Sequence, residues 1–143
     1  MIMSVNDVQD KIMMELASID EDIESVLCYI IDSGKMLSHM PAAFKTDANL
    51  IKGCHAKVWL ACRTEGSRMF FYADSDTIIS RGLAGLLVRV FSGQRREEIL
   101  NSNVYFIHKH HLDRFIGTKR SAGLSAMIEQ IKTYSRARSG RIA

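Results

Sequence analysis

The sequence predicts an α+β fold in which a small antiparallel sheet of about three strands packs against several helices. Two runs of β-forming residues, 58–64 and 68–73, are separated by a short turn, which is typical of a hairpin. The stretches on both sides of this hairpin repeat apolar residues at the helical period. The length suits one hydrophobic core, so we expect a single domain over residues 1–143, with a basic, frayed tail at about 136–143.

Two helices are expected before the hairpin. Ser4 is placed to cap the first. Ser18–Glu21 has the spacing of a capping box and is expected to open the second helix, which Gly34 ends as a left-handed cap. Residues 35–53 show little periodicity, so we expect a long irregular connection, and connections of that length are usually functional. The apolar positions expected on the inner faces of the two helices are Val5, Val8, Ile12 and Leu16 in the first, and Ile23, Val26, Leu27, Ile30 and Ile31 in the second.

The hairpin is expected to lie at the centre of the sheet. The run VWLACRT at 58–64 is apolar at nearly every position, as in a strand covered on both faces. The Asp and Ser side chains of the ADSD segment, 73–76, are expected to cap the next helix, which Gly93 ends. The remaining helices are expected at 95–101, near 104–112, and from 118–121 onwards.

Cysteine content and hydropathy bear on the cellular setting. Three irregularly placed cysteines do not make a disulfide framework, which favours a reducing, cytoplasmic environment. The N-terminus mixes acidic residues into its apolar ones and is interpreted as a mature helix rather than a leader. No apolar run approaches the ~20 residues that span a bilayer, so we expect no membrane insertion.

The net charge of +3 is unevenly distributed along the chain. A basic end can hold RNA, which leaves a non-catalytic, RNA-binding interaction module as an alternative function. Tyr134 is the only aromatic residue among these basic residues, so a solvated helix face is favoured and no nucleic-acid partner is expected. The basic residues at this end are Lys132, Arg136, Arg138 and Arg141.

Cys54 is the main candidate for chemistry, in the stretch NLIKGCHAKVW. The preceding glycine allows a sharp turn that places the sulfur at a loop tip. Neighbouring Lys52, Lys57 and, when protonated, His55 are expected to favour the thiolate, which is the nucleophilic form. The alternative is that Cys54 packs as a small hydrophobe, with a structural role only. Apolar packing is the expected role of the other two cysteines, Cys28 and Cys62.

Other chemistries have weaker support. His108 and His111 are expected to share a helix face, close to His110, but no thiol or carboxylate completes a metal site and no CxxC pair occurs, so we expect no metal. One of these histidines could serve as the base of a cysteine hydrolase, although nothing identifies an oxyanion hole. Neither GxGxxG nor GxxxxGK[ST] is present, so no nucleotide site is expected.

Three separated motifs resemble the SufE/CsdE family of cysteine desulfurase activators: LIKGCHAKVW, then ADSD with the RGL of residues 81–83, then KRSAGLSAMI. The resemblance covers about residues 5–135 and implies a SufE-like fold. It implies that Cys54 accepts sulfur as a persulfide from a pyridoxal-phosphate-dependent cysteine desulfurase of the SufS/CsdA type, and passes it to an iron-sulfur scaffold. It implies a partner protein without turnover of its own and without a cofactor, since the pyridoxal phosphate belongs to the desulfurase.

The resemblance also implies supporting or partner-binding roles for residues around the cysteine. The positions of the aspartates fit helix caps equally well, whereas an arginine near a helix N-terminus favours a specific partner. A swinging loop, with Gly53 as hinge, would both cover and deliver a persulfide. The family commonly has Gln and Ser after the cysteine, where this chain has His55 and Ala56. The supporting residues are Gly53, His55, Lys57, Asp74, Asp76 and Arg120.

Overall fold

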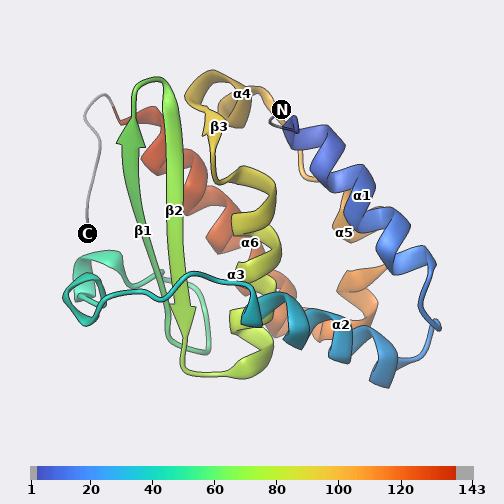
Figure 1. The fold of residues 1–143 in the computed structure, drawn as a ribbon. Coiled ribbons are helices and arrows are strands. Elements are labelled where there is room, and N and C mark those ends of the chain that lie inside the picture. Colours follow the sequence, from blue (N-terminus) through green and yellow to red (C-terminus); the bar gives the residue numbers. More distant parts are fainter. Residues whose placement is uncertain (1–2, 138–143) are drawn as a thin grey trace.

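The computed structural model describes residues 3–137, and its helices and strands are arranged in layers (Figure 1). In chain order the elements are α1 (Val5–Ala17), α2 (Ile23–Lys35), short 3-10 helices at Ala42–Phe44 and Asp47–Asn49, β1 (Val58–Glu65), β2 (Arg68–Ser75), α3 (Ile78–Phe91), β3 (Gln94–Arg95), α4 (Arg96–Asn101), α5 (Phe106–Lys109) and α6 (Leu112–Arg136). Helices α3 and α6 lie against one side of the sheet, and α1 and α2 lie beyond α3. The predicted α+β class is confirmed.

The three strands form an antiparallel sheet in the order β1-β2-β3. The predicted hairpin is present, with Glu65 paired to Arg68 and Gly66 at φ +63° in the turn. The expectation that β1 is covered on both faces is wrong, because Trp59 and Arg63 are only partly buried. The outer face of the sheet is only partly covered. The ring of Phe44, a residue before β1, packs edge-on against Tyr72 and covers part of this face.

The predicted inner face of α1 is confirmed. Its four expected apolar residues are all buried, and Ser4 caps the helix through a capping box with Asp7. Behind this face, Gln9 is fully buried and fastens α1 to the chain before α5. Its amide donates to the Asn103 carbonyl at 2.9 Å and accepts from the Tyr105 N–H at 2.8 Å. These hydrogen bonds fix α1 against a segment that is distant in the sequence.

Helix α2 differs from the prediction at both ends. Asp22, not Ser18, caps it by accepting from the Ser25 N–H at 2.8 Å, and Ile23 on the expected inner face is 58% exposed. Gly34 is not a left-handed cap, because the helix continues through Lys35. Gly34 is instead buried against α3, where a Cβ would lie 2.9 Å from the backbone nitrogen of Gly82. The glycine therefore serves a close crossing of two helices.

The chain after α3 is more broken than the sequence suggests. Gly93 follows α3 with φ +84°, as expected of a residue that ends a helix. The helix expected near 104–112 is only the single turn α5, because His111 adopts the left-handed conformation (φ 56°) and α6 begins after it. Helix α6 is kinked at Gly117 (φ 84°, ψ 169°), so its long second part starts where the last helix was expected, at Thr118.

The basic tail was expected to start at about residue 136. Arg136 is the last residue of α6 and pairs with Glu129 at 3.3 Å, so within the described residues the helix ends at the position where the tail was expected to begin. Residues 138–143, with Arg138 and Arg141, lie outside the described residues. Within residues 3–137, none of the helices combines the length and the apolar character that crossing a membrane requires.

Candidate functional site: a partly buried cysteine beside a groove

Cys54 lies in a tight loop immediately before β1. The Ile51 N–H donates to the Val58 carbonyl at 2.8 Å and closes this loop at its base. Gly53 has φ +91°, a conformation that favours glycine, so the predicted turn is present. The loop lies against α6 at Gly123 and Ala126, and the side chain of Cys54 is partly buried there. The sulfur is therefore covered by a helix rather than displayed at an open loop tip.

The Cys54 thiol donates a hydrogen bond to the carbonyl oxygen of Gly123, with 3.5 Å between Sγ and O. Burial raises the pKa of this thiol above its ordinary value. The expectation that Lys52, His55 and Lys57 favour the thiolate is thus wrong for this conformation. These three side chains are exposed, whereas the sulfur faces α6. Burial in this conformation therefore favours the neutral thiol of Cys54.

A groove of about 900 Å³ lies beside the loop. It brings together His55, Asp76 and Arg120, three predicted site residues from three different segments. Ile78, the first residue of α3, also lines the groove and is 59% exposed. The full lining is His55, Ala56, Asp76, Thr77, Ile78, Ile79, Ser80, Ile116, Gly117, Thr118, Lys119 and Arg120. Apolar and cationic groups thus stand next to the cysteine loop.

Asp76 ties the end of the cysteine loop to the start of α3. Its carboxylate accepts from the Lys57 N–H at 3.0 Å, and its own N–H donates to the Lys57 carbonyl at 3.2 Å. The expectation that this aspartate caps the helix is wrong, because Thr77 is the N-cap and accepts from the Ser80 N–H. Lys57 makes both of these contacts with its backbone and not with its ammonium group.

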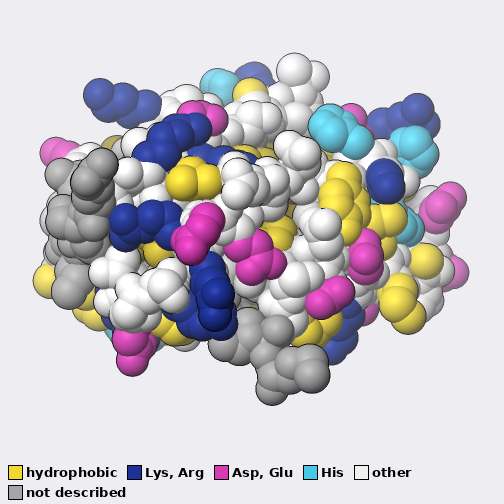
Figure 2. All heavy atoms as spheres, turned by 90° about the horizontal axis from the view of Figure 1, so that it is seen from above, with side chains coloured by type: hydrophobic (Ala, Val, Ile, Leu, Met, Phe, Trp, Pro, Cys, Tyr) yellow, Lys and Arg dark blue, Asp and Glu magenta, His cyan; other side chains and the backbone are white. Residues whose placement is uncertain are grey.

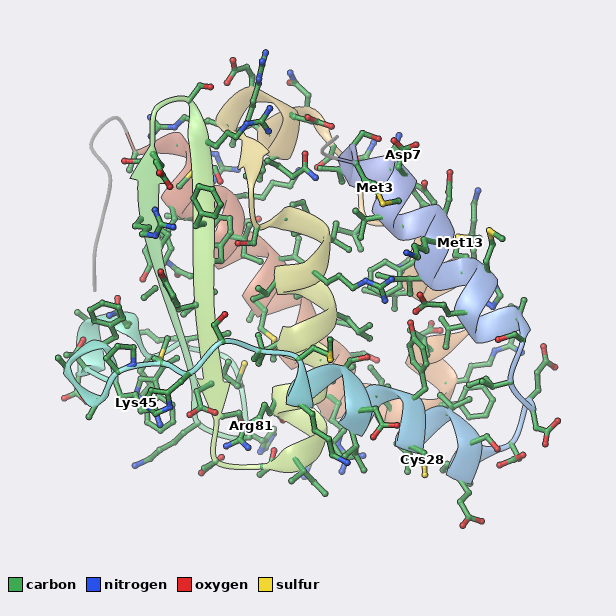
Figure 3. The ribbon with its side chains drawn as sticks, in the orientation of Figure 1. Met3, Asp7, Met13, Cys28, Lys45 and Arg81 are labelled. Atoms are coloured by element: carbon green, nitrogen blue, oxygen red, sulfur yellow. The ribbon has the colours of Figure 1, made fainter. Side chains whose placement is uncertain are left out.

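Asp74 belongs to a separate cluster at the end of β2, whose members Lys45 and Arg81 are labelled in Figure 3. Its carboxylate pairs with Lys45 at 2.6 Å and with Arg81 at 2.8 Å, residues that come from the connection before β1 and from α3. Burial raises the pKa of this carboxyl, but hydrogen bonds from Lys45, the Ser75 N–H and Arg81 together outweigh burial, so the pKa lies below its usual value. Asp74 neither caps the helix nor lines the groove; it braces three segments.

Arg120 lies on the exposed surface of α6, just after the kink at Gly117. Among the described residues, no carboxylate forms an ion pair with it. The local ion pair considered from the sequence is therefore absent within residues 3–137. Its guanidinium group borders the groove, where it is available to a group from outside the chain.

The remaining candidates from the sequence do not join this site. Cys62 is buried in β1, as expected, but Cys28 is exposed on α2 with its sulfur directed outward, so its expected packing role is wrong (Figure 3). His108 and His111 do not share a helix face, since His111 is left-handed and His108 approaches Asp113 at 3.6 Å. No group of three or more potential metal ligands occurs in the part of the chain that is described.

Two contributors to the site were missed in the sequence. Gly123 sits in the middle of α6, where glycine is unfavourable relative to alanine, and such a glycine signals a close approach of another group. That signal was available in the KRSAGLSAMI motif. No sequence pattern indicates that Ile78 is exposed in the groove, because its exposure depends on how the cysteine loop and α6 are placed around the start of α3.

Comparison with known proteins supports the family resemblance. A family model described as "SufE: Fe-S metabolism associated domain" matches residues 10–135. An uncharacterized SufE-like protein of Rhizobium meliloti (strain 1021) is 34% identical over 134 residues, covering 90% of this chain and 95% of that protein. A cysteine desulfuration protein SufE of Wigglesworthia glossinidia brevipalpis is 31% identical over 118 residues, covering 81% of this chain and 82% of that protein.

One solved structure bears on the fold. The solution structure of a hypothetical protein from Thermus thermophilus superposes with a TM-score of 0.75 at 16% identity, covering 90% of this chain and 93% of that one. The likeness at this identity concerns the fold alone. The family match over most of the chain and the SufE-named relatives lead to one conclusion: the chain belongs to the SufE family and has a role in Fe-S metabolism.

Proposed function

We propose that this protein accepts sulfane sulfur on Cys54 from the persulfide of a cysteine desulfurase and passes it on for iron-sulfur cluster assembly. The observation that carries the proposal is the placement of Cys54 in a glycine-containing loop, partly covered by α6 and next to a groove that a partner can enter. Family membership supports it, and a relative is named a cysteine desulfuration protein.

The transfer balances without any further reagent. The Cys54 thiol loses its proton to solvent or to a partner group, and its sulfur attacks the outer sulfur of the desulfurase persulfide. A new S–S bond forms on Cys54 while the S–S bond in the desulfurase breaks, and the desulfurase cysteine leaves as a thiolate. Cys54 then carries the persulfide. Pyridoxal phosphate does its chemistry on the desulfurase, so we propose no cofactor for this chain.

The groove provides a place for the desulfurase segment that carries the persulfide. Ile78 offers an exposed apolar contact, and Arg120 offers a cation without a partner among the described residues. Partner contacts at such a site gain most from an apolar anchor next to a charged group that becomes desolvated. His55, also in the groove, stands where the family commonly has Gln and adds an imidazole ring to this surface.

Sulfur transfer requires the loop to move. Cys54 faces α6 in the described conformation, whereas attack on another protein's persulfide requires its sulfur to leave that position. Gly53 supplies the conformational freedom for a hinge, and the Asp76–Lys57 hydrogen bonds anchor the far end of the loop. Hydrogen exchange should therefore show residues 51–57 less protected when the desulfurase is bound.

The proposal is tested by intact-mass spectrometry after mixing the protein with a cysteine desulfurase and cysteine. Wild type is expected to gain the mass of one sulfur atom, and Cys54→Ser is expected to gain none. Cys28→Ser is the matched control, because it removes an exposed thiol on α2 and should leave the gain unchanged. Sulfur on Cys28, or none on any cysteine, would overturn the proposal.

The alternative of RNA binding predicts salt-sensitive RNA affinity that does not depend on Cys54. On the face shown in Figure 2, acidic side chains lie among the Lys and Arg side chains, and they would weaken the attraction of this face for a phosphate backbone. We therefore favour sulfur transfer. RNA binding that is unaffected by Cys54→Ser, with no sulfur gained by the wild type, would reverse this preference.

A further inference from the structure

We propose that Gly123 is a positioning residue for the sulfur acceptor, because its missing side chain and its carbonyl oxygen together form a seat for the sulfur of Cys54. The seat holds the thiol against α6 and so controls how often it becomes available. This inference rests on the proposed function, since it concerns the atom that would receive the sulfur. Gly123 acts through Cys54 rather than on the transferred sulfur itself.

The space left by Gly123 is occupied by Cys54. A Cβ built on Gly123 would lie 3.3 Å from Sγ, 3.8 Å from Cβ and 3.9 Å from Cα of Cys54. A contact of 3.3 Å between carbon and sulfur is tighter than ordinary van der Waals packing, so the sulfur would have to move away from the helix. An alanine at position 123 therefore requires the sulfur to shift by a few tenths of an ångström, which loosens its contact with the helix.

The contact with Cys54 accounts for this glycine. A glycine within a helix costs about 1 kcal/mol relative to alanine. Gly34, Gly82 and Gly85 are explained by the crossing of α2 and α3, because a Cβ on any of them would meet backbone atoms of the other helix. For Gly123, all three of the nearest atoms that a Cβ would meet belong to Cys54. Glycine at position 123 therefore lowers the stability of the helix but leaves space for the side chain of Cys54.

The carbonyl of Gly123 selects the protonated form of the thiol. The carbonyl oxygen accepts a hydrogen bond from the thiol S–H, with 3.5 Å between O and Sγ. A thiolate has no hydrogen to donate and would face the negative end of the carbonyl dipole. The raised pKa of Cys54 agrees with this arrangement, and burial is its only cause among the described groups. The ionisable groups on the cysteine loop and along the neighbouring groove are Lys52, His55, Lys57, Asp76, Lys119 and Arg120.

The test measures alkylation of Cys54 by iodoacetamide as a function of pH, in a Cys28→Ser background so that no other exposed thiol reacts. Gly123→Ala is expected to react about fivefold faster near neutral pH, the equilibrium change that corresponds to about 1 kcal/mol of overpacking at the seat. The midpoint of its pH profile is expected to move to lower pH. Ser125→Ala, an exposed substitution on the same helix, is the matched control and should react as the background does.

The proposal is overturned if Gly123→Ala and Ser125→Ala have the same rate and the same pH midpoint. If Gly123→Ala does not fold, the test uses two variants that keep Gly123. The alkylation rate of Cys54, measured in Cys28→Ser, should be lower than that of Cys28, measured in Cys54→Ser. Equal rates would refute the seat. No desulfurase is present in these assays. Intact-mass spectrometry would therefore show whether the proposed sulfur transfer is wrong, and the alkylation assay would show whether the proposed role of Gly123 is wrong.

Discussion

Gly82 lies where α2 and α3 approach most closely, and replacing it with alanine tests this packing. A Cβ at Gly82 would overlap the carbonyl oxygen of Ile30 and lie 2.7 Å from its Cγ2 atom. These atoms belong to the backbone and to a branched side chain of α2, so the whole helix has to shift. Overpacking of this kind costs about 3 kcal/mol, and alanine regains about 1 kcal/mol of helix propensity. We expect Gly82→Ala to lower the free energy of unfolding by about 2 kcal/mol.

Urea denaturation followed by circular dichroism measures this change, as a lower midpoint with an unchanged slope. Gly123→Ala is the matched control, because the atoms nearest to its Cβ belong to Cys54, and the closest of them, Sγ, lies at 3.3 Å. We expect the control to stay within about 0.5 kcal/mol of wild type. If Gly82→Ala proved as stable as Gly123→Ala, the two helices would not cross backbone to backbone, and the glycine of the RGL motif would need another explanation.

Two further substitutions test the helix layer. A hydrogen bond from Arg89 is the main cause that lowers the pKa of Glu15 to about 2, so the stability from this pair is present above about pH 4.5 and is lost as pH falls toward 2. Because both side chains are about a third exposed, Glu15→Gln should cost only about 1 kcal/mol in urea midpoints at pH 7 and nothing near pH 2; an equal loss at both pH values would contradict this. Gln9→Leu leaves the N–H of Tyr105 without its acceptor and should cost about 2 kcal/mol in the same assay, whereas a neutral result would mean that water replaces the amide.

The sequence predicted the position of Cys54 better than its surroundings. Cys54 after a glycine was predicted in a loop before a strand, and it is found there. The thiolate expected from neighbouring cations is wrong, because the sulfur turns toward α6 and burial raises its pKa. The roles of the aspartates also differ from prediction, since Asp74 and Asp76 pair with distant segments instead of capping the adjacent helix.

Local patterns thus determined the elements of this protein. The apolar stripe of α1, the hairpin and the glycine turn before Cys54 each depend on residues close together in the chain, where side-chain period and backbone freedom act directly. The tertiary structure alone decided the surroundings of the cysteine. Cys54 and Gly123 are 69 positions apart, and only the packing of α6 against the loop brings the thiol to its carbonyl acceptor and partly shields it from water.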